Sequence, residues 1–472
     1  MMFVITAIEP ATSLVSAQMR PMIVPPTSTA AIAASQYRIR RLVMIPNILS
    51  WGVSPIETPV SLMPSLHPDP EGRRLASDNV AEGGACARVR RRPTVGPAEQ
   101  GSGHAVKATV QKVAFDNGGA FIRETRREVE QYLARGSTRL NGLLLLYAKA
   151  PVAIGLTAAS WTVLVFARPG LIAGFLCLAG LVLGVMLNAF CVQHDANHGA
   201  YFRRRRYNNL VGWTADALLG FSSYVWRVKH NVAHHTYTNV DGYDADATQV
   251  PLARFTPSQA PKPWYRFQHY YIWPMYALMG LRWQTVGDIA AFARGSVGES
   301  PLRAPRGWNL AGVIVGKAIF VTWAIAIPLL VYPWWAVLGA YIGFTMVTSL
   351  IMATTFQLAH CVEEASFASA EEVRAARPAW AVHEVETTVD FCPRNPVLTW
   401  MLGGLNFQIE HHLFPRVPHT HYPQIARIVR SNCATHGVRY SSQPSLRAAL
   451  RSHFLHLRAM GRLGLPAEIE MG

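Results

Sequence analysis

Three clusters of histidine along this chain have the spacing of metal ligands. They comprise seven residues: His194, His198, His230, His234, His235, His411 and His412. Because residues i and i+4 share one face of a helix, the i, i+4 pairs of the first two clusters can each direct two imidazoles at one point. The second ring of an adjacent pair points about 100° further round, toward a neighbouring metal. The spacing predicts that the three clusters bind metal together.

An eighth histidine, His360, stands alone at the end of an apolar stretch. Eight imidazoles exceed the needs of a tetrahedral zinc ion, which takes about four ligands. They suit two transition-metal ions, and nitrogen donors with open positions favour iron that binds dioxygen. For His360 alone, an ordinary residue at the membrane interface is an equally good interpretation.

Polar residues beside the clusters are candidates to hold the imidazole N–H groups in place. They are Asp195, Asn197, Asp241, Asp244, Asp246 and Glu410. For any one of them, a role as a solvated loop or capping residue is equally consistent with the sequence.

Four nearly uncharged stretches are the elements that must position these histidines. We predict membrane spans at about 150–167, 171–192, 311–331 and 336–359, the first beginning just after Lys149. Each is about the length that crosses a bilayer, and aromatic residues at 332–335 suit a membrane interface. Buried core helices of a soluble protein are a poorer interpretation, because the stretches form pairs joined by very short turns.

The charge distribution predicts an orientation. The net charge is +16, half the residues are apolar, and basic runs at 203–206 and 303–306 lie away from both short turns. The positive-inside bias then places the active site and both termini in the cytoplasm. We predict an all-α integral membrane protein with four transmembrane helices in two hairpins and a cytoplasmic helical cap that carries a di-iron site. Basic loops beside apolar spans explain the charge better than nucleic-acid binding does.

The remaining sequence divides into segments with different expected roles. Six scattered cysteines without a Cys-x-x-Cys pair indicate neither a disulfide framework nor a zinc site. Residues 1–105 read as a disordered extension or an unused upstream start, 106–455 as the catalytic domain and 456–472 as a tail. Within the domain, residues 114–139 predict an amphipathic helix broken at Gly136.

The three clusters resemble the histidine boxes of the membrane fatty acid desaturases. The resembling strings are His-Asp-x-x-His from His194, His-Asn-x-x-His-His-x-x-Thr-Asn from His230, and Gln-x-Glu-His-His-Leu-Phe-Pro from Gln408. The glutamine that opens the third string is similar to the front-end branch, whose members act between an existing double bond and the carboxyl end. The resemblance covers about residues 106–451.

This resemblance implies two iron ions as cofactor and a set of ligands for them. The implied ligands are His194, His198, His230, His234, His235, His360, His411 and His412, with Gln408 as a weak ligand or a residue that only lines the site. The implied reaction introduces a double bond into an acyl chain, carried as a coenzyme A thioester or a membrane lipid, with dioxygen and two external electrons.

Many front-end desaturases also contain a fused cytochrome domain with a His-Pro-Gly-Gly signature, and here His67-Pro68 is followed by Asp69-Pro70. We therefore expect a separate electron donor, such as a ferredoxin or a flavin/iron–sulfur reductase. The arginines at 203–206 suit docking of an acidic partner or anchoring to the membrane surface. The alternatives to a desaturase are a membrane di-iron hydroxylase or ketolase and, more remotely, a metal-binding membrane protein without redox chemistry.

Overall fold

The computed structural model describes residues 113–248 and 252–464, so the predicted extension at 1–105 lies outside it. The chain divides into two units, Met1–Pro93 and Thr94–Gly472, and every described residue belongs to the second. The description below concerns these residues alone.

Four helices in this part of the chain are long and apolar enough to cross a membrane. They cover Gly142–Ala167, Leu171–His198, Trp308–Leu329 and Trp334–His360. In element terms they are α3 (Gly136–Thr162) with η1 (Val163–Ala167), α4 (Leu171–Leu187) with η2 (Asn188–Gln193) and α5 (His194–His198), α11 (Trp308–Val321) with η6 (Thr322–Ala326) and α12 (Ile327–Leu329), and α13 (Trp334–His360). Each of the four predicted spans overlaps one of these helices, and the protein is a membrane protein.

The first of these helices starts earlier than predicted. We placed its membrane part after Lys149, but the apolar helix already includes that residue. Lys149 does not end the span because its side chain is buried and its Nζ donates a hydrogen bond to the carbonyl oxygen of Trp400, 2.9 Å away. The amphipathic helix predicted at 114–139 is the shorter α2 (Ala120–Ala134), and Gly136 begins α3.

Helices α3 and α4 pack closely through small residues. A Cβ atom at Gly180 would lie 2.5 Å from the Ser160 hydroxyl, and one at Gly184 would lie 2.5 Å from the Thr157 hydroxyl. Small residues let helix backbones approach in this way inside membranes, where no hydrophobic effect drives helices together. Short connections at residues 168–170 and 330–333 join the first to the second span and the third to the fourth.

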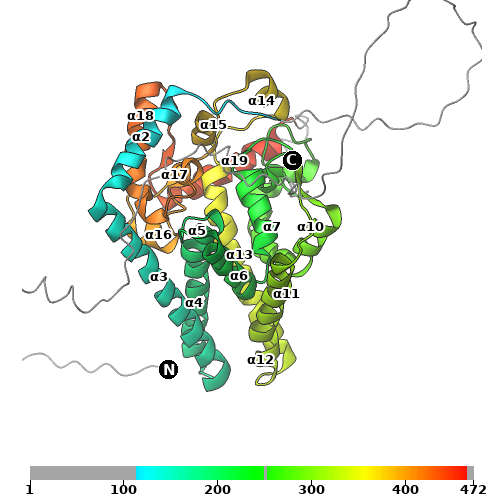
Figure 1. Cartoon of the computed structure of the whole chain (residues 1–472). Helices are drawn as coiled ribbons and strands as arrows, with labels where there is room; N and C mark the ends of the chain where they lie inside the picture. Colours follow the sequence, from blue (N-terminus) through cyan, green and yellow to red (C-terminus); the bar gives the residue numbers. More distant parts are fainter. Residues whose placement is uncertain (1–112, 249–251, 465–472) are drawn as a thin grey trace, which may run out of the picture. The chain divides into compact units, whose positions relative to one another are not determined.

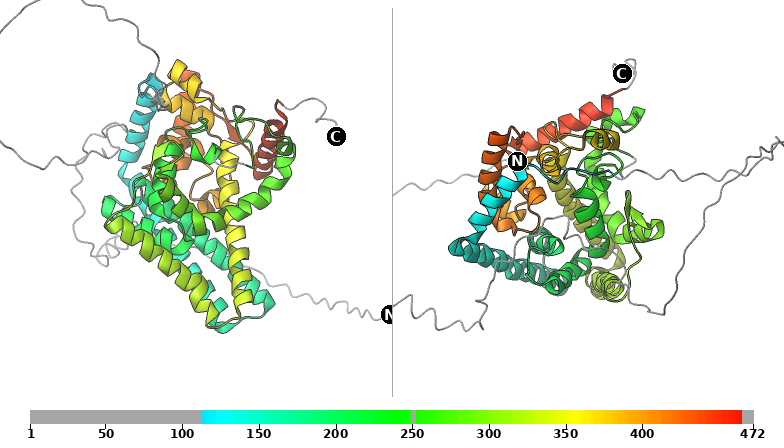
Figure 2. Two further views of the ribbon diagram at one scale, coloured as in Figure 1. Left: turned by 90° about the vertical axis from the view of Figure 1, so that its right-hand side faces the viewer. Right: turned by 45° about the horizontal axis from the view of Figure 1, so that its top comes forward.

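The remaining helices gather at one end of the spanning helices (Figures 1 and 2). Between the second and third spans they are α6 (Arg205–Leu219), α7 (Ser223–Arg227), η3 (Val228–His234), α8 (Ala245–Thr248), η4 (Pro263–Phe267), α9 (Gln268–Arg282), η5 (Trp283–Gly287) and α10 (Asp288–Arg294). After the fourth span they are α14 (Ala370–Ala376), α15 (Trp380–Thr387), α16 (Pro396–Met401), α17 (Gln408–Leu413), η7 (His419–His421), α18 (Tyr422–His436) and α19 (Leu446–Arg462).

Two very short sheets complete the described fold. The strands are β1 (Ser296–Val297), antiparallel to β2 (Ser300–Pro301), and β3 (Asp390–Phe391), parallel to β4 (Ser442–Gln443). The second sheet fastens the start of α19 to the segment before α16. Helix α19 continues past residue 455, where we expected the domain to end, and Leu457 in it is fully buried.

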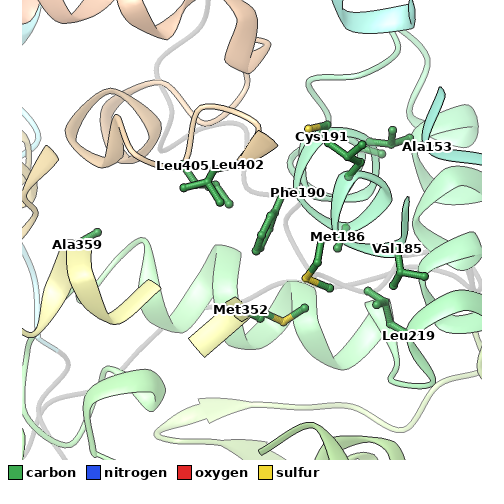
Figure 3. Packing of buried hydrophobic residues seen from close by; sticks show 14 of the residues in the cluster. Ala153, Val185, Met186, Phe190, Cys191, Leu219, Met352, Ala359, Leu402 and Leu405 are labelled. Carbon is green, nitrogen blue, oxygen red and sulfur yellow. The ribbon is translucent and has the colours of Figure 1, made fainter. Parts of the chain in front are cut away.

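A buried apolar cluster lies where the second and fourth spans meet the later segments. Figure 3 shows Phe190, Met186, Met352 and Leu405 gathered in one place, although they come from η2, α4, α13 and the segment before α17. The ring centroids of Phe190 and Phe356 are 6.3 Å apart, and that of Phe356 is 6.0 Å from His230. The apolar cluster therefore reaches the histidines.

Candidate metal centre

Four histidines from the three clusters form a first group. Their ligand-capable nitrogens all lie within 4.8 Å of one another, and all four side chains are buried; the members are His194, His198, His230 and His411. Helix α5 carries two of them, η3 one and α17 one. The ring of Trp226, just before η3, stacks on His230 with centroids 4.3 Å apart and closes one side of the group.

A second group forms beside the first. It consists of His234, His360 and His412, again buried and with nitrogens within 4.8 Å of one another. His235 lies between the two groups, because its Nε2 is 3.2 Å from Nε2 of His230 and its ring stacks on His412 with centroids 4.2 Å apart. All eight histidines singled out from the sequence thus meet in one place.

Gln408, the ninth candidate, lies at the second group. Its Nε2 is 3.0 Å from Nε2 of His360, and its Oε1 has no hydrogen-bond partner in the described part of the chain. The amide is buried at the start of α17, one turn before His411 and His412. The structure therefore places Gln408 where it contacts a candidate ligand.

The second cluster belongs to both groups. As expected from their i, i+4 spacing, His230 and His234 come together, because their ligand-capable nitrogens and an oxygen of Asp246 lie within 4.8 Å of one another. His230 also belongs to the first group and His234 to the second, and the two stand on the π-helical turn Val228–His234. The adjacent pair His411 and His412 does divide between the groups, as its spacing predicts.

The donor atoms that face the groups lack protein partners. Nε2 of His194, His198, His411 and His412 is buried and makes no hydrogen bond within the described residues. A buried polar atom without a partner costs about 1–3 kcal/mol, and metal ligation would satisfy all four. Burial and the neighbouring histidines lower the pKa of His411 and His412 well below the usual value, so their imidazoles are neutral, the form that ligates metal. The two groups therefore suit two metal ions with nitrogen ligands.

Comparison with known proteins identifies the family. The profile described as fatty acid desaturase matches residues 169–444. An sn-1 linoleoyl-lipid 6-desaturase of Arthrospira platensis is 34% identical over 355 residues, which cover 75% of this chain and 96% of that protein. A second protein of that name, from Synechocystis sp., is 31% identical over 75% of this chain and 99% of its own length. An acyl-lipid (8-3)-desaturase of Physcomitrium patens is 36% identical over 57% of each chain.

The chain belongs to the fatty acid desaturase family. The predicted family, front-end branch and oxidoreductase activity are thereby confirmed. The family assignment also favours the desaturase over the hydroxylase and over a binding protein without redox chemistry.

In this desaturase, several of the imidazoles are held through Nδ1, which leaves Nε2 facing the groups. Nδ1 of His234 is 3.1 Å from the Asp244 carboxylate, and Nδ1 of His411 is 3.2 Å from the Tyr422 hydroxyl. Burial lowers the pKa of His234, but the Asp244 carboxylate outweighs this effect and the net shift is upward. Such partners fix the orientation of a ligating ring and raise its basicity.

The polar residues singled out beside the clusters have mixed roles. Asp244 holds His234 as expected. Asp241 instead accepts from Ser258, and Glu410 accepts from the Tyr440 hydroxyl at 3.2 Å. Asp246 pairs with Lys229 and also lies beside His230 and His234, with the ligand-capable atoms of the three within 4.8 Å of one another. Asp195 accepts from His419, and the backbone oxygen of Asn197 accepts from Asn231.

The desaturase has a further ligand partner that the sequence did not indicate. Glu384, on α15, is fully buried and its Oε2 lies 2.6 Å from Nδ1 of His412 and 2.8 Å from the Thr238 hydroxyl. Its neighbour His383 is also buried, and its Nε2 donates to the Thr238 carbonyl at 2.8 Å. Neither residue stands in a recognisable box, and only the packing of α15 on α17 brings them to the site.

Proposed function

We propose that this desaturase binds two iron ions and uses them to introduce a double bond into the acyl chain of a membrane lipid. The proposed ligands are His194, His198, His230, His234, His235, His360, His411 and His412, with Gln408 beside the second group. Bound iron would supply the activation of dioxygen needed to remove two hydrogens from an unactivated pair of methylenes. The observation that carries the proposal is the pair of adjacent groups of buried histidines with unpartnered nitrogens.

The protein's own residues orient the ligands and exclude water. Asp244, Glu384 and Tyr422 hold three imidazoles through Nδ1. All eight histidines are buried, so bulk water has little access to a reactive centre formed among them. Phe356 and the apolar cluster around Phe190 adjoin His230, and we propose that the reacting part of the acyl chain approaches along this apolar side.

For the topology we propose two hairpins, with the metal centre and both termini in the cytoplasm. The short connections at 168–170 and 330–333, and the exposed arginines at 203–206 beyond the second span, support this orientation. Single cysteines placed in the connections and in residues 203–206 would be labelled from opposite sides of sealed vesicles. Labelling of all of them from one side would contradict the proposed orientation.

For the substrate we propose an acyl chain esterified to a lipid, with the new bond on the carboxyl side of an existing one. The support comes from two relatives, which are sn-1 linoleoyl-lipid 6-desaturases and match this chain over 96% and 99% of their own lengths. We also propose that electrons come from a separate protein such as a ferredoxin or a flavin/iron–sulfur reductase. The exposed arginines at 203–206 suit an acidic donor and suit anionic lipid equally well.

The decisive experiment expresses the chain with a ferredoxin and its reductase in a host supplied with linoleate. Gas chromatography–mass spectrometry of the fatty acids, after position-specific lipase digestion, should show a new double bond between the existing bonds and the carboxyl end. A His411→Ala variant that still inserts in the membrane serves as the inactive control. Formation of an alcohol would indicate the hydroxylase, and active protein holding only zinc would contradict the di-iron centre.

A further inference from the structure

Lys149 is a buried cation within the first spanning helix. Its Nζ lies 2.8 Å from Nε2 of His419, 2.9 Å from the Trp400 carbonyl oxygen and 3.8 Å from Sγ of Cys191. An ammonium group has three N–H donors and no acceptor. These three contacts can therefore use all of its donors, and the charge has no direct carboxylate partner among them.

This arrangement fixes the tautomer of His419. Because the ammonium can only donate, Nε2 of His419 must accept, and the ring proton of a neutral imidazole then stands on Nδ1. That nitrogen lies 2.8 Å from Oδ2 of Asp195, and the backbone N–H of His419 donates to the same oxygen at 3.2 Å. The hydrogen bonds therefore run in one direction, from Lys149 through His419 to Asp195.

The carboxylate of Asp195 leads on to a candidate metal ligand. Its other oxygen, Oδ1, lies 3.9 Å from Nδ1 of His194, an electrostatic contact longer than a hydrogen bond. His194 belongs to the first group of histidines, and its Nε2 makes no hydrogen bond within the described residues. Lys149, His419, Asp195 and His194 are all buried. A series of buried contacts thus connects a lysine in the membrane-spanning region with the candidate metal centre.

We propose that Lys149 and His419 are positioning residues that act through Asp195 to hold His194 toward the first metal ion. The proposal rests on the proposed di-iron function. A buried carboxylate needs hydrogen bonds and a compensating charge to stay fixed. Here His419 donates the hydrogen bonds, and Lys149, on the far side of His419, provides the charge. The charge of a fixed Asp195 favours the orientation of the His194 ring in which Nδ1 lies toward the carboxylate, which leaves Nε2 for the metal.

If Lys149 had only a structural role, its replacement would lower the melting temperature without affecting iron retention. Lys317 provides a matched control for this comparison. Lys317, in the third span, also donates to two carbonyl oxygens, of Gly220 at 2.7 Å and of Gln284 at 2.9 Å. It pairs with Asp288 at 3.1 Å, and none of these contacts leads to a histidine. Both lysines tie a spanning helix to other segments, but only Lys149 connects to the candidate metal centre.

The test compares Lys149→Met and Lys317→Met in the full-length, iron-loaded protein in detergent. The measurements are iron per chain, the rate of iron release to a ferrous chelator, and the melting temperature of the metal-free protein. We expect both variants to melt at lower temperature, and only Lys149→Met to lose iron retention by about 10–100-fold, the usual effect of removing a partner of a metal ligand. Equal iron release from Lys149→Met and wild type, or from the two variants, would overturn the proposal.

A second pair of variants tests the same proposal if Lys149→Met does not fold. His419→Asn retains a nitrogen donor near the position of Nδ1, whereas His419→Leu removes it. Iron retention should be better in His419→Asn, and equal losses in both would also overturn the proposal. If the wild-type protein itself holds no iron, the proposed function fails first; if it holds two irons that these changes do not affect, only the positioning role is wrong.

Discussion

Replacement of Glu384 tests whether the second group of histidines holds a metal ion. Glu384 is fully buried, and its Oε2 accepts from His412 Nδ1 at 2.6 Å and from the Thr238 hydroxyl at 2.8 Å. In Glu384→Ala the Thr238 hydroxyl can still donate to the His234 carbonyl oxygen, 2.8 Å away. The N–H of His412 then keeps only a longer contact, to the Thr238 hydroxyl oxygen 3.2 Å from Nδ1, and this weakened hydrogen bond accounts for most of the loss.

The size of the effect follows from this weakened hydrogen bond. Leaving one buried donor wholly without a partner costs about 1–3 kcal/mol, which is the upper limit here, and every 1.4 kcal/mol is about tenfold in an equilibrium constant. We therefore expect iron at the second group to bind more weakly by up to about 150-fold, which includes the roughly 10–100-fold usual for such partners. Glu384→Gln should lose less, because its amide oxygen can still accept from His412.

The assay counts the iron that stays bound during dialysis against a chelator. Wild type should retain two irons per chain and Glu384→Ala about one, held by the first group. The control is Glu124→Ala, which removes a similar contact of 2.9 Å to His436 at a site where both side chains are partly exposed. Such a pair contributes about 0–1 kcal/mol, so iron content should not change. Two firmly held irons in Glu384→Ala, or equal loss from both variants, would refute the reasoning.

Three further outcomes are expected. His360→Ala should abolish desaturation and lower bound iron without affecting membrane insertion, while His436→Ala, which alters a partly exposed histidine, should keep both; equal activity of the two variants would remove His360 from the site. A chain starting at Val106 should insert and remain active, and loss of all desaturation in inserted protein would show that the preceding residues are needed. Burial raises the pKa of Asp216 to about 7 in the folded protein, whereas in the unfolded chain the carboxyl ionises near pH 4. Between these two pH values the carboxyl is therefore neutral in the folded protein and ionised in the unfolded chain. Its contribution to the free energy of unfolding therefore falls as pH rises from about 4 to about 7, and thermal melting at pH 5 and pH 8 should show a smaller loss for Asp216→Asn than for wild type.

The sequence by itself determined the chemistry and the spans of this protein. Histidine spacing does so because i, i+4 and adjacent positions have fixed directions in a helix, and long uncharged stretches do so because only a bilayer favours them so strongly. The family resemblance pointed to His360 as well, although it stands in no box. What spacing could not supply was which histidines of different segments meet, such as His234 of η3 with His360 of α13 and His412 of α17.

Only the tertiary structure decided which residues support the ligands. Glu384 reaches His412 because α15 packs on α17. A lone glutamate within a short helix, outside every histidine box, cannot be recognised as a ligand partner from the sequence. From the sequence, we placed the start of the first span just after Lys149, because a charge in an apolar stretch is costly unless it is paired. Its partners, His419 and Trp400, lie more than 250 residues further along the chain. Contacts between segments so far apart depend on how the helices pack against one another, and a local pattern of residues does not predict which distant side chains will meet.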